Sequence, residues 1–200
     1  MTEFPNDPFA AFAQWFEEAR NSEPADPNAM TVATATATGR PSARVALLKA
    51  WDDRGFVFYT NLESRKSVEI RENPQVALLF HWKSLQRQVR IEGQAAQVSD
   101  EQADAYFATR PRVSRLGAWA SAQSRPLADR ATFEARLREV EARFPTDPFP
   151  RPPFWSGWRV SPEVLEFWQD MAYRLHERIV FRRGPGPREK GGWEKSRLYP

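Results

Sequence analysis

The chain has 200 residues, of which 41% are hydrophobic and none is cysteine, and its formal net charge is +3. This length suffices for one domain with a sizeable core, and we predict a single domain spanning residues 1–200. Without cysteine, and with only His81 and His176, disulfides and the usual zinc sites are excluded, so we expect no metal.

Three further function classes are disfavoured by composition. No apolar run approaches the ~20 residues of a membrane span, and residues 1–5 lack the start of a signal peptide, so we expect a cytoplasmic protein without a membrane partner. Basic residues are interspersed with acidic ones, and we therefore expect no nucleic-acid partner.

The first 60 residues predict one helix and three strands. Phe9, Phe12 and Phe16 recur at helical spacing, which predicts an amphipathic helix within an N-terminal helical segment, residues 1–25. Alternation of small apolar residues and threonine predicts a strand, and turns at residues 39–41 and 52–55 follow. The predicted elements are a helix at 8–20 and a three-strand meander at 30–38, 42–51 and 55–60.

Ser64 predicts the start of a short helix that ends before Pro74, which places Arg65 and Lys66 in its first turn. Cations in a first turn oppose the helix dipole unless an anion binds the free backbone N–H groups there. The pair therefore indicates a phosphate site. The alternative is two solvated cations, tolerated at a cost of up to ~1 kcal/mol.

The remaining elements predict helices in mid-chain and strands towards the C-terminus. The long charged helix has Phe133, Leu137 and Val140 as its expected buried stripe. The predicted strands are 75–82, 86–98, 155–160, 164–168, 174–182 and 193–198, the helices are 64–73, 99–110, 114–121 and 128–144, and 184–187 form the last turn.

Many antiparallel strands with inserted helices predict a mainly β, α+β fold, an antiparallel closed or split barrel with peripheral helices. The sequence lacks a Gly-rich strand-to-helix loop and a serine elbow, so Rossmann, P-loop and hydrolase folds lack their defining stretch.

One pair of segments carries the chemistry: Leu165-Glu166-Phe167-Trp168-Gln169 and, four residues later, Arg174-Leu175-His176-Glu177-Arg178. If the second segment is a strand, Arg174, His176 and Arg178 share one face. Two guanidiniums beside an imidazole repel each other unless an anion lies between them, so this face predicts an anionic ligand. A solvated strand face is the alternative.

These segments resemble the C-terminal signature of the pyridoxamine 5′-phosphate oxidase family, and the resemblance extends from about residue 26 to residue 200. It implies an FMN-binding split barrel. The implied FMN contacts are Arg44, Val45, Ala46, Leu47, Leu48, Lys49, Tyr59, Thr60, Arg65, Lys66, Gln88, Gln123, Ser124, Trp168 and Arg178. The implied substrate contacts are Lys49, Tyr106, Arg110, Ser114, Arg174, Leu175 and His176.

The resemblance also implies a reaction. Pyridoxamine 5′-phosphate or pyridoxine 5′-phosphate is oxidised to pyridoxal 5′-phosphate by oxygen, with release of hydrogen peroxide. Arg174 and His176 stand at the implied catalytic positions around the substrate ring, and neither is assigned as an obligatory base.

A homodimer with flavin at its interface is implied as well. The many Trp and Phe residues are a second reason to expect it, because they suggest more aromatic surface than so small a chain easily buries. In an ideal strand Arg44 and Lys49 face opposite sides, so a single site needs a bulge or a site shared between subunits.

The chain departs from the family pattern in two places. No segment before residue 26 matches the family's Arg- and Tyr-rich N-terminal arm, and Asp170 stands where a glycine is common. One alternative is therefore an FMN-dependent oxidase of another ring compound, of the phenazine-biosynthesis type, although the retained substrate-phosphate residues argue against it. The others are a non-catalytic flavin- or pyridoxal-phosphate-binding module and, more weakly, a basic nucleic-acid-binding barrel.

Overall fold

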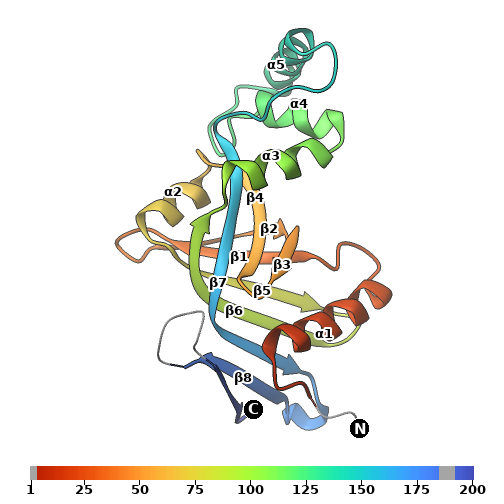
Figure 1. The fold of residues 1–200 in the computed structure, drawn as a ribbon, viewed down its shortest axis with the longest axis vertical. Helices are drawn as coiled ribbons and strands as arrows, with labels where there is room; N and C mark the ends of the chain where they lie inside the picture. The colour runs from red at the N-terminus through yellow and green to blue at the C-terminus, as the bar shows by residue number, and fades with distance from the viewer. Residues whose placement is uncertain (1–3, 185–191) are drawn as a thin grey trace.

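The computed structural model describes residues 4–184 and 192–200, and within them the chain forms one antiparallel sheet with some helices beside it and others grouped at one end of the molecule (Figure 1). The helices are α1 (Pro8–Ser22), α2 (Arg65–Glu72), α3 (Asp100–Thr109), α4 (Arg112–Ala120), α5 (Arg130–Arg143) and the 3₁₀ turn η1 (Ala172–Arg174). The strands are β1 (Ala29–Ala35), β2 (Pro41–Leu47), β3 (Ala50–Asp52), β4 (Gly55–Asn61), β5 (Gln75–Trp82), β6 (Arg87–Gln97), β7 (Trp155–Gln169), β8 (Glu177–Arg183) and β9 (Trp193–Leu198).

The order of the strands explains why the sheet curls. Its main path runs β2-β1-β5-β6-β7-β4-β3, and β8 and β9 continue from β7. β2 and β3 are the two ends of this path, yet only Leu48 and Lys49 separate them in the chain. The sheet must therefore bend until its ends approach each other. The predicted α+β split barrel is confirmed.

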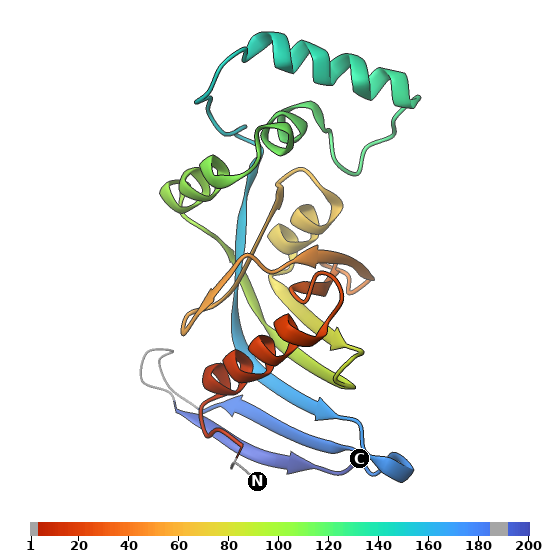
Figure 2. The ribbon, with the colours of Figure 1, turned by 90° about the vertical axis from the view of Figure 1, so that its right-hand side faces the viewer.

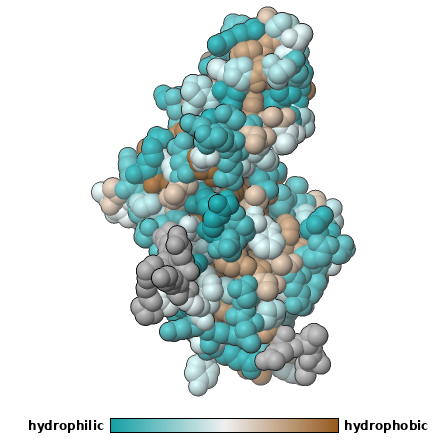
Figure 3. Space-filling view, viewed as in Figure 1, coloured by the Kyte–Doolittle hydropathy of each residue, from teal (hydrophilic) through white to brown (hydrophobic). Residues whose placement is uncertain are grey.

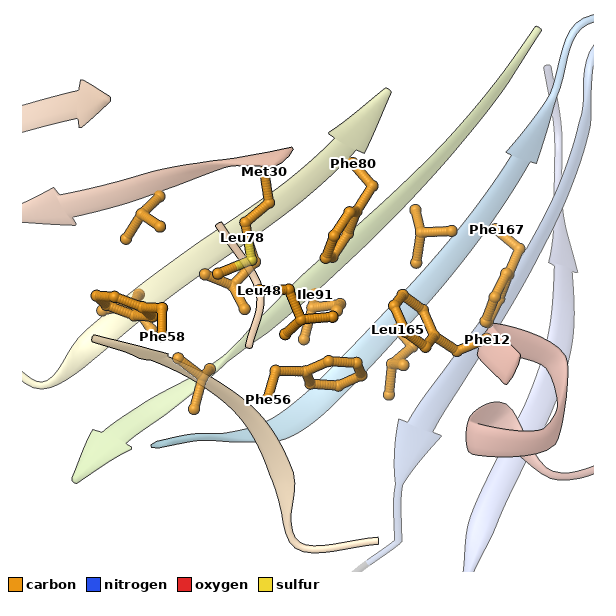
Figure 4. Close-up of a cluster of buried hydrophobic side chains, with 14 of the residues drawn as sticks. Phe12, Met30, Leu48, Phe56, Phe58, Leu78, Phe80, Ile91, Leu165 and Phe167 are labelled. Carbon is orange, nitrogen blue, oxygen red and sulfur yellow. The ribbon is translucent and has the colours of Figure 1, made fainter. Parts of the chain in front are cut away.

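The core fills the inside of this curled sheet. β5 alternates buried and accessible residues, and Leu78 and Phe80 point inward with Phe56 of β4 and Phe167 of β7 (Figure 4). Phe12 of α1 closes the cluster from outside the sheet, with its ring centroid 4.9 Å from that of Phe56. Burial of these large apolar side chains is the main stabilising term.

Aromatic residues are mostly inside, which corrects one expectation. Among the described residues, the exposed large hydrophobic side chains include two tyrosines but no Trp or Phe. The face shown in Figure 3 is mostly hydrophilic, with hydrophobic residues in small separate patches. Excess aromatic surface is thus no argument for a dimer, because the barrel and its helices bury the rings.

β7 is one continuous strand of 15 residues, where two strands were predicted. It runs from the group of α3, α4 and α5 to β8 and β9 at the other end of the molecule (Figures 1 and 2). Pro162 lies inside it opposite Gly93, where the β6–β7 register shifts. A Cβ on Gly93 would lie 2.1 Å from the Ser161 carbonyl oxygen, so this close approach requires glycine.

Two predicted strands are interrupted. The strand expected at 42–51 breaks at Leu48 and Lys49 into β2 and β3. β2 pairs with β1 and β3 pairs with β4, so both pairings of the predicted meander are present, but its middle strand is not continuous. The strand expected at 174–182 begins only at Glu177. Tyr173 and Arg174 have φ of 58° and 63°, and the chain turns there.

The remaining differences are small. α5 has no fully buried residue, so its predicted stripe of Phe133, Leu137 and Val140 is only half-buried. The turn predicted at 184–187 falls on residues 185–187, which lie outside the described residues. No helix in the described part of the chain has both the length and the apolar character needed to cross a membrane.

Candidate functional site

A cavity of about 270 Å³ lies where α3 and α4 meet β4 and the start of β7. We call it the anion pocket because Lys49 and Arg110 both line it. Lys49 comes from the break between β2 and β3, and Arg110 directly follows α3. The other lining residues are Tyr59, Thr60, Asn61, Tyr106, Ser114, Gly117, Ala118, Ser121, Gln123 and Trp155.

Arg110 is the strongest sign that this pocket takes an anion. Its Nη1 atom is buried and has no hydrogen-bond partner among the described residues, while its guanidinium lies 4.8 Å from the ring centroid of Trp155. Burial lowers the pKa of Arg110; Tyr106 opposes this shift and Arg115 adds to it. A buried guanidinium with an unused donor is costly, and a phosphate would satisfy it.

Stacked aromatic rings form one wall of the pocket. The Tyr59 and Tyr106 centroids are 3.9 Å apart with an interplanar angle of 13°, and Trp155 lies 5.3 Å from Tyr59. Burial raises the pKa of both tyrosines. The phenols therefore stay neutral donors and do not repel an anion.

Lys66 does not line this pocket but is hydrogen-bonded to two residues that do, Thr60 and Gln123. Its Nζ atom donates to the Thr60 hydroxyl at 2.8 Å, the Ser64 hydroxyl at 3.1 Å and Gln123 Oε1 at 2.9 Å. Burial, helped by the charge of Arg44, lowers the pKa of Lys66 to about 8. A second anion next to this ammonium would favour its charged form.

Glu69 holds the neighbouring cations. Its side chain is only 4% exposed and accepts hydrogen bonds from Thr34 and Ser42 at 2.5 Å and from Arg65 Nε at 2.8 Å. Arg44 Nη2 lies 3.4 Å away. Burial raises the pKa of Glu69, but these hydrogen bonds and the charge of Arg65 outweigh it and hold the pKa at about 2.

The consequence is a small cationic cluster, Arg44, Arg65 and Lys66, with one buried counter-charge. The cluster carries a net positive charge, because a single carboxylate cannot neutralise three cations. Arg65 and Lys66 open α2, as predicted, and Ser64 is its N-cap residue. Unused N–H groups of this first turn add to the attraction for a phosphate.

A second cavity, of about 340 Å³, lies at the other end of β7, and we call it the C-terminal cavity. Gln88, Trp168 and Arg178 line it. Arg178 donates to Glu166 at 2.8 Å and to the Tyr199 carbonyl at 3.1 Å. Glu166 raises the pKa of Arg178. Leu79, Arg90, Glu166 and Pro200 complete the lining.

The turn after β7 lies beside this cavity, and we call residues 170–176 the signature turn. His176 Nδ1 is 2.8 Å from Asp170 Oδ1, and its ring centroid lies 4.6 Å from that of Trp168. Arg174 and Leu175 are exposed, and Arg174 forms no ion pair with any described residue. The prediction that Arg174, His176 and Arg178 share one strand face is therefore wrong, because Arg174 and His176 lie in the signature turn whereas Arg178 lies in β8.

Comparison with known proteins decides the family. Residues 16–144 match the family described as pyridoxamine 5′-phosphate oxidase, and residues 155–200 match the pyridoxine 5′-phosphate oxidase C-terminal dimerisation region. The chain belongs to the pyridoxamine 5′-phosphate oxidase family.

Relatives named pyridoxine/pyridoxamine 5′-phosphate oxidase support this. The one from Granulibacter bethesdensis is 61% identical over 98% of this chain and 92% of its own length. The one from Sphingopyxis alaskensis is 63% identical over 98% of this chain and 88% of its own length.

Solved structures agree in fold. PhzG from Burkholderia lata, in complex with tetrahydrophenazine-1-carboxylic acid, superposes with a TM-score of 0.90 at 32% identity, covering 98% of this chain and 94% of its own. An FMN-binding protein from Nostoc punctiforme, related to pyridoxamine 5′-phosphate oxidase, gives a TM-score of 0.77 at 17% identity over 97% and 98% of the two chains.

The residues predicted from the family signature fall into groups. The anion pocket contains Lys49, Tyr59, Thr60, Tyr106, Arg110, Ser114 and Gln123, and the C-terminal cavity contains Gln88, Trp168 and Arg178. Neither cavity is lined by the remaining predicted residues: Arg44, Val45, Ala46, Leu47, Leu48, Arg65, Lys66, Ser124, Arg174, Leu175 and His176.

Sequence reasoning missed some of the supporting residues. Glu69 follows Arg65 by one helical turn, a spacing that could have indicated the ion pair. Glu166 lies directly opposite Arg90 in the β6–β7 register, which an alignment of the two strands could have shown. Nothing in the sequence around Trp155 indicates that it stacks in the anion pocket.

Proposed function

We propose that this chain is an FMN-dependent oxidase that converts pyridoxamine 5′-phosphate, pyridoxine 5′-phosphate or both to pyridoxal 5′-phosphate. Oxygen is consumed and hydrogen peroxide is released; the amine substrate also takes up water and releases ammonia. The observation that carries the proposal is the anion pocket, with a buried unpaired donor of Arg110 next to Lys49 and Ser114.

The cationic cluster fits the phosphate of FMN. Arg44, Arg65 and Lys66 supply charged donors on one side of the barrel, and Glu69 keeps the two arginines in place before the cofactor binds. A terminal phosphate at a helix start suits FMN, and the sequence has no second dinucleotide signature that would suit FAD. FMN, when bound, supplies the hydride acceptor that oxygen reoxidises.

The substrate phosphate fits the anion pocket. Arg110 and Lys49 donate charge-assisted hydrogen bonds, Ser114 adds a hydroxyl, and the Tyr59–Tyr106 stack excludes water from that side. Binding energy from this remote phosphate holds the substrate ring in place for reaction, which is how non-reacting groups of a substrate contribute to rate.

The ring itself would be held by Arg174 and His176 of a second copy of the chain. The anion pocket and the C-terminal cavity are separate in one protomer, and the matched C-terminal region is described as a dimerisation region. A homodimer in which the signature turn of one subunit reaches the anion pocket of the other would assemble both sets of predicted residues. Arg174 then orients the ring and stabilises charge at the reacting carbon.

Oxidation of a tricyclic ring compound is the second candidate function. The structural similarity to PhzG favours it. Against it, the relatives at 61% and 63% identity are named pyridoxine/pyridoxamine 5′-phosphate oxidase. The two cations of the pocket, Lys49 and Arg110, and the hydroxyl of Ser114 suit a phosphate dianion better than a carboxylate monoanion.

Oxygen uptake by the purified protein tests the proposal. Flavin released by heat should chromatograph as FMN. Pyridoxamine 5′-phosphate or pyridoxine 5′-phosphate should drive steady oxygen uptake with formation of pyridoxal 5′-phosphate, while unphosphorylated pyridoxamine, the matched control, should be far slower. Recovery of FAD, or uptake only with a reduced phenazine carboxylate, contradicts the proposal. Tight binding of pyridoxal 5′-phosphate without uptake would instead indicate a non-catalytic module.

A further inference from the structure

We propose that Asp170 is a positioning residue that holds the imidazole of His176 in one tautomer, with the proton on Nδ1. The inference deepens the proposed function, on which its kinetic consequence rests. Its structural part depends only on the contacts of the signature turn.

Two groups compete for Nδ1 of His176. The carboxylate oxygen Asp170 Oδ1 lies 2.8 Å from it, and the backbone N–H of Met171 approaches it at 3.4 Å. The first contact needs a proton on Nδ1, whereas the second needs a lone pair there, so one tautomer cannot satisfy both. The contact with the carboxylate is shorter and charge-assisted, and it decides the position of the proton.

Asp170 itself is anchored. Its backbone N–H donates to the Gln86 carbonyl at 2.9 Å, and Gln169 Nε2 reaches the Leu85 carbonyl at 3.2 Å. These bonds tie the end of β7 to the β5–β6 turn, so the carboxylate projects from a fixed point of the backbone. Trp168 covers the imidazole, with the two rings tilted by 42°. The ring is therefore held at one edge and along one face.

The chemical consequence concerns Nε2. The tautomer in which Nδ1–H donates to Asp170 leaves Nε2 as an acceptor for a ligand. A carboxylate that holds a histidine in this way selects its tautomer and orientation without being protonated itself. Asparagine at position 170 has nearly the same shape, but its NH₂ group can donate to a bare Nδ1 and select the opposite tautomer.

Nitrogen NMR of the FMN-loaded protein gives a readout that does not depend on turnover. The chain has only two histidines, so the His81→Gln variant assigns the signals of His176. We expect Nδ1 to be protonated in the wild type, Nδ1 to lose its proton in Asp170→Asn, and Asp170→Glu to restore the wild-type pattern. A bare Nδ1 in the wild type, or an Nδ1 signal that is the same in Asp170→Asn, overturns the proposal.

Steady-state kinetics give the functional readout. At equal FMN content, Asp170→Asn should lower kcat by about 10²-fold with a small change in KM. The reason is that the wrong tautomer of His176 would present an N–H donor instead of an acceptor to the reacting substrate. Asp53→Asn, a change at an exposed aspartate of the β3–β4 turn, is the matched control and should leave kcat unchanged. Wild-type kcat in Asp170→Asn overturns the kinetic part.

Failure of the proposed function and failure of the positioning role give different results. If the wild type lacks oxidase activity while the NMR pattern follows Asp170 as expected, the proposed function fails and the positioning role stands. If the wild type is an active oxidase but the His176 signals are the same in Asp170→Asn, the positioning role fails and the proposed function stands.

Discussion

The anion pocket and the signature turn are built in opposite ways. The pocket draws its residues from segments far apart in the chain, from Lys49 to Trp155, and it encloses them inside one protomer. The turn draws its residues from seven consecutive positions, and most of its side chains are exposed, including Tyr173 at 94% and Leu175 at 67%.

The two regions therefore suit different tasks. In the folded monomer Arg110 Nη1 is already shielded from water, so an anion that binds in the pocket meets a preformed partner. The turn is solvated, and under the proposed function it would act once the second subunit covers it. A preformed pocket should govern affinity for the substrate phosphate, whereas the turn should govern the rate of the reaction.

Replacement of Arg110 is the change with the largest expected effect. Arg110→Ala removes the buried guanidinium, and we expect kcat/KM for the phosphorylated substrates to fall by at least about 10²-fold, since each charge-assisted hydrogen bond is worth about 1.5–3 kcal/mol. FMN content should not change. Steady-state oxygen uptake measures this, with Arg136→Ala on exposed α5 as the control.

An equal fall in kcat/KM for pyridoxamine without its phosphate would contradict this assignment. Such a result would place Arg110 in folding or flavin binding, and the pocket would then not be the phosphate site.

Replacement of Arg174 tests the turn. Arg174→Ala should lower kcat by about 10²-fold, because an aligned donor is lost at the reacting ring, while bound FMN is retained. An arginine that stays solvated would give wild-type kcat and KM, which contradicts the assignment. Loss of FMN would instead move Arg174 to the cofactor site. Rapid purification followed by flavin absorbance and oxygen uptake separates these results.

The same contrast explains what could be predicted from sequence. β5 and β9 were predicted with their observed bounds, and Ser99 was predicted to begin a helix, because alternation and capping are local properties. The break at Lys49 and the passage of β7 through Pro162 depend on partners elsewhere: Val57 for Lys49 and Gly93 for Pro162. Local patterns contain no information about those partners.

The site follows the same rule. The family resemblance named seven of the residues that line the anion pocket but missed Trp155. Neither the resemblance nor the alternation of residues showed that Arg174 lies at φ 63°, outside any strand. The spacing of Arg65 and Glu69 could have indicated their ion pair, but the burial of Glu69 against Thr34 and Ser42 arises only when β1, β2 and α2 pack together.

Replacement of Arg65 has a smaller expected effect, on the cofactor. Arg65 is half-exposed, with 56% of its side chain accessible, so its contact with an FMN phosphate is screened by solvent. We expect Arg65→Ala to weaken FMN binding by about tenfold, near the low end for a charge-assisted hydrogen bond. Fluorescence titration of the flavin-free protein measures this, and an unchanged Kd would mean that Arg65 is a solvated surface residue.

The smallest expected effect is a pH dependence of FMN binding that comes from Lys66. Its pKa is lowered to about 8 by burial and by Arg44, so the side chain is charged below pH 8 and loses its proton as pH rises above it. A phosphate is already fully ionised there, since its second pKa is about 6. A bound dianion favours charged Lys66 and raises its pKa, so FMN binding takes up a proton near pH 8. Affinity for FMN should therefore be constant from pH 7 to about 7.5 and fall by up to about tenfold per pH unit above 8.

Lys66→Arg is the matched control, because a guanidinium stays protonated and should give a flat profile. Equal slopes for the two proteins would show that Lys66 does not meet the phosphate, and the cationic cluster would then reduce to Arg44 and Arg65.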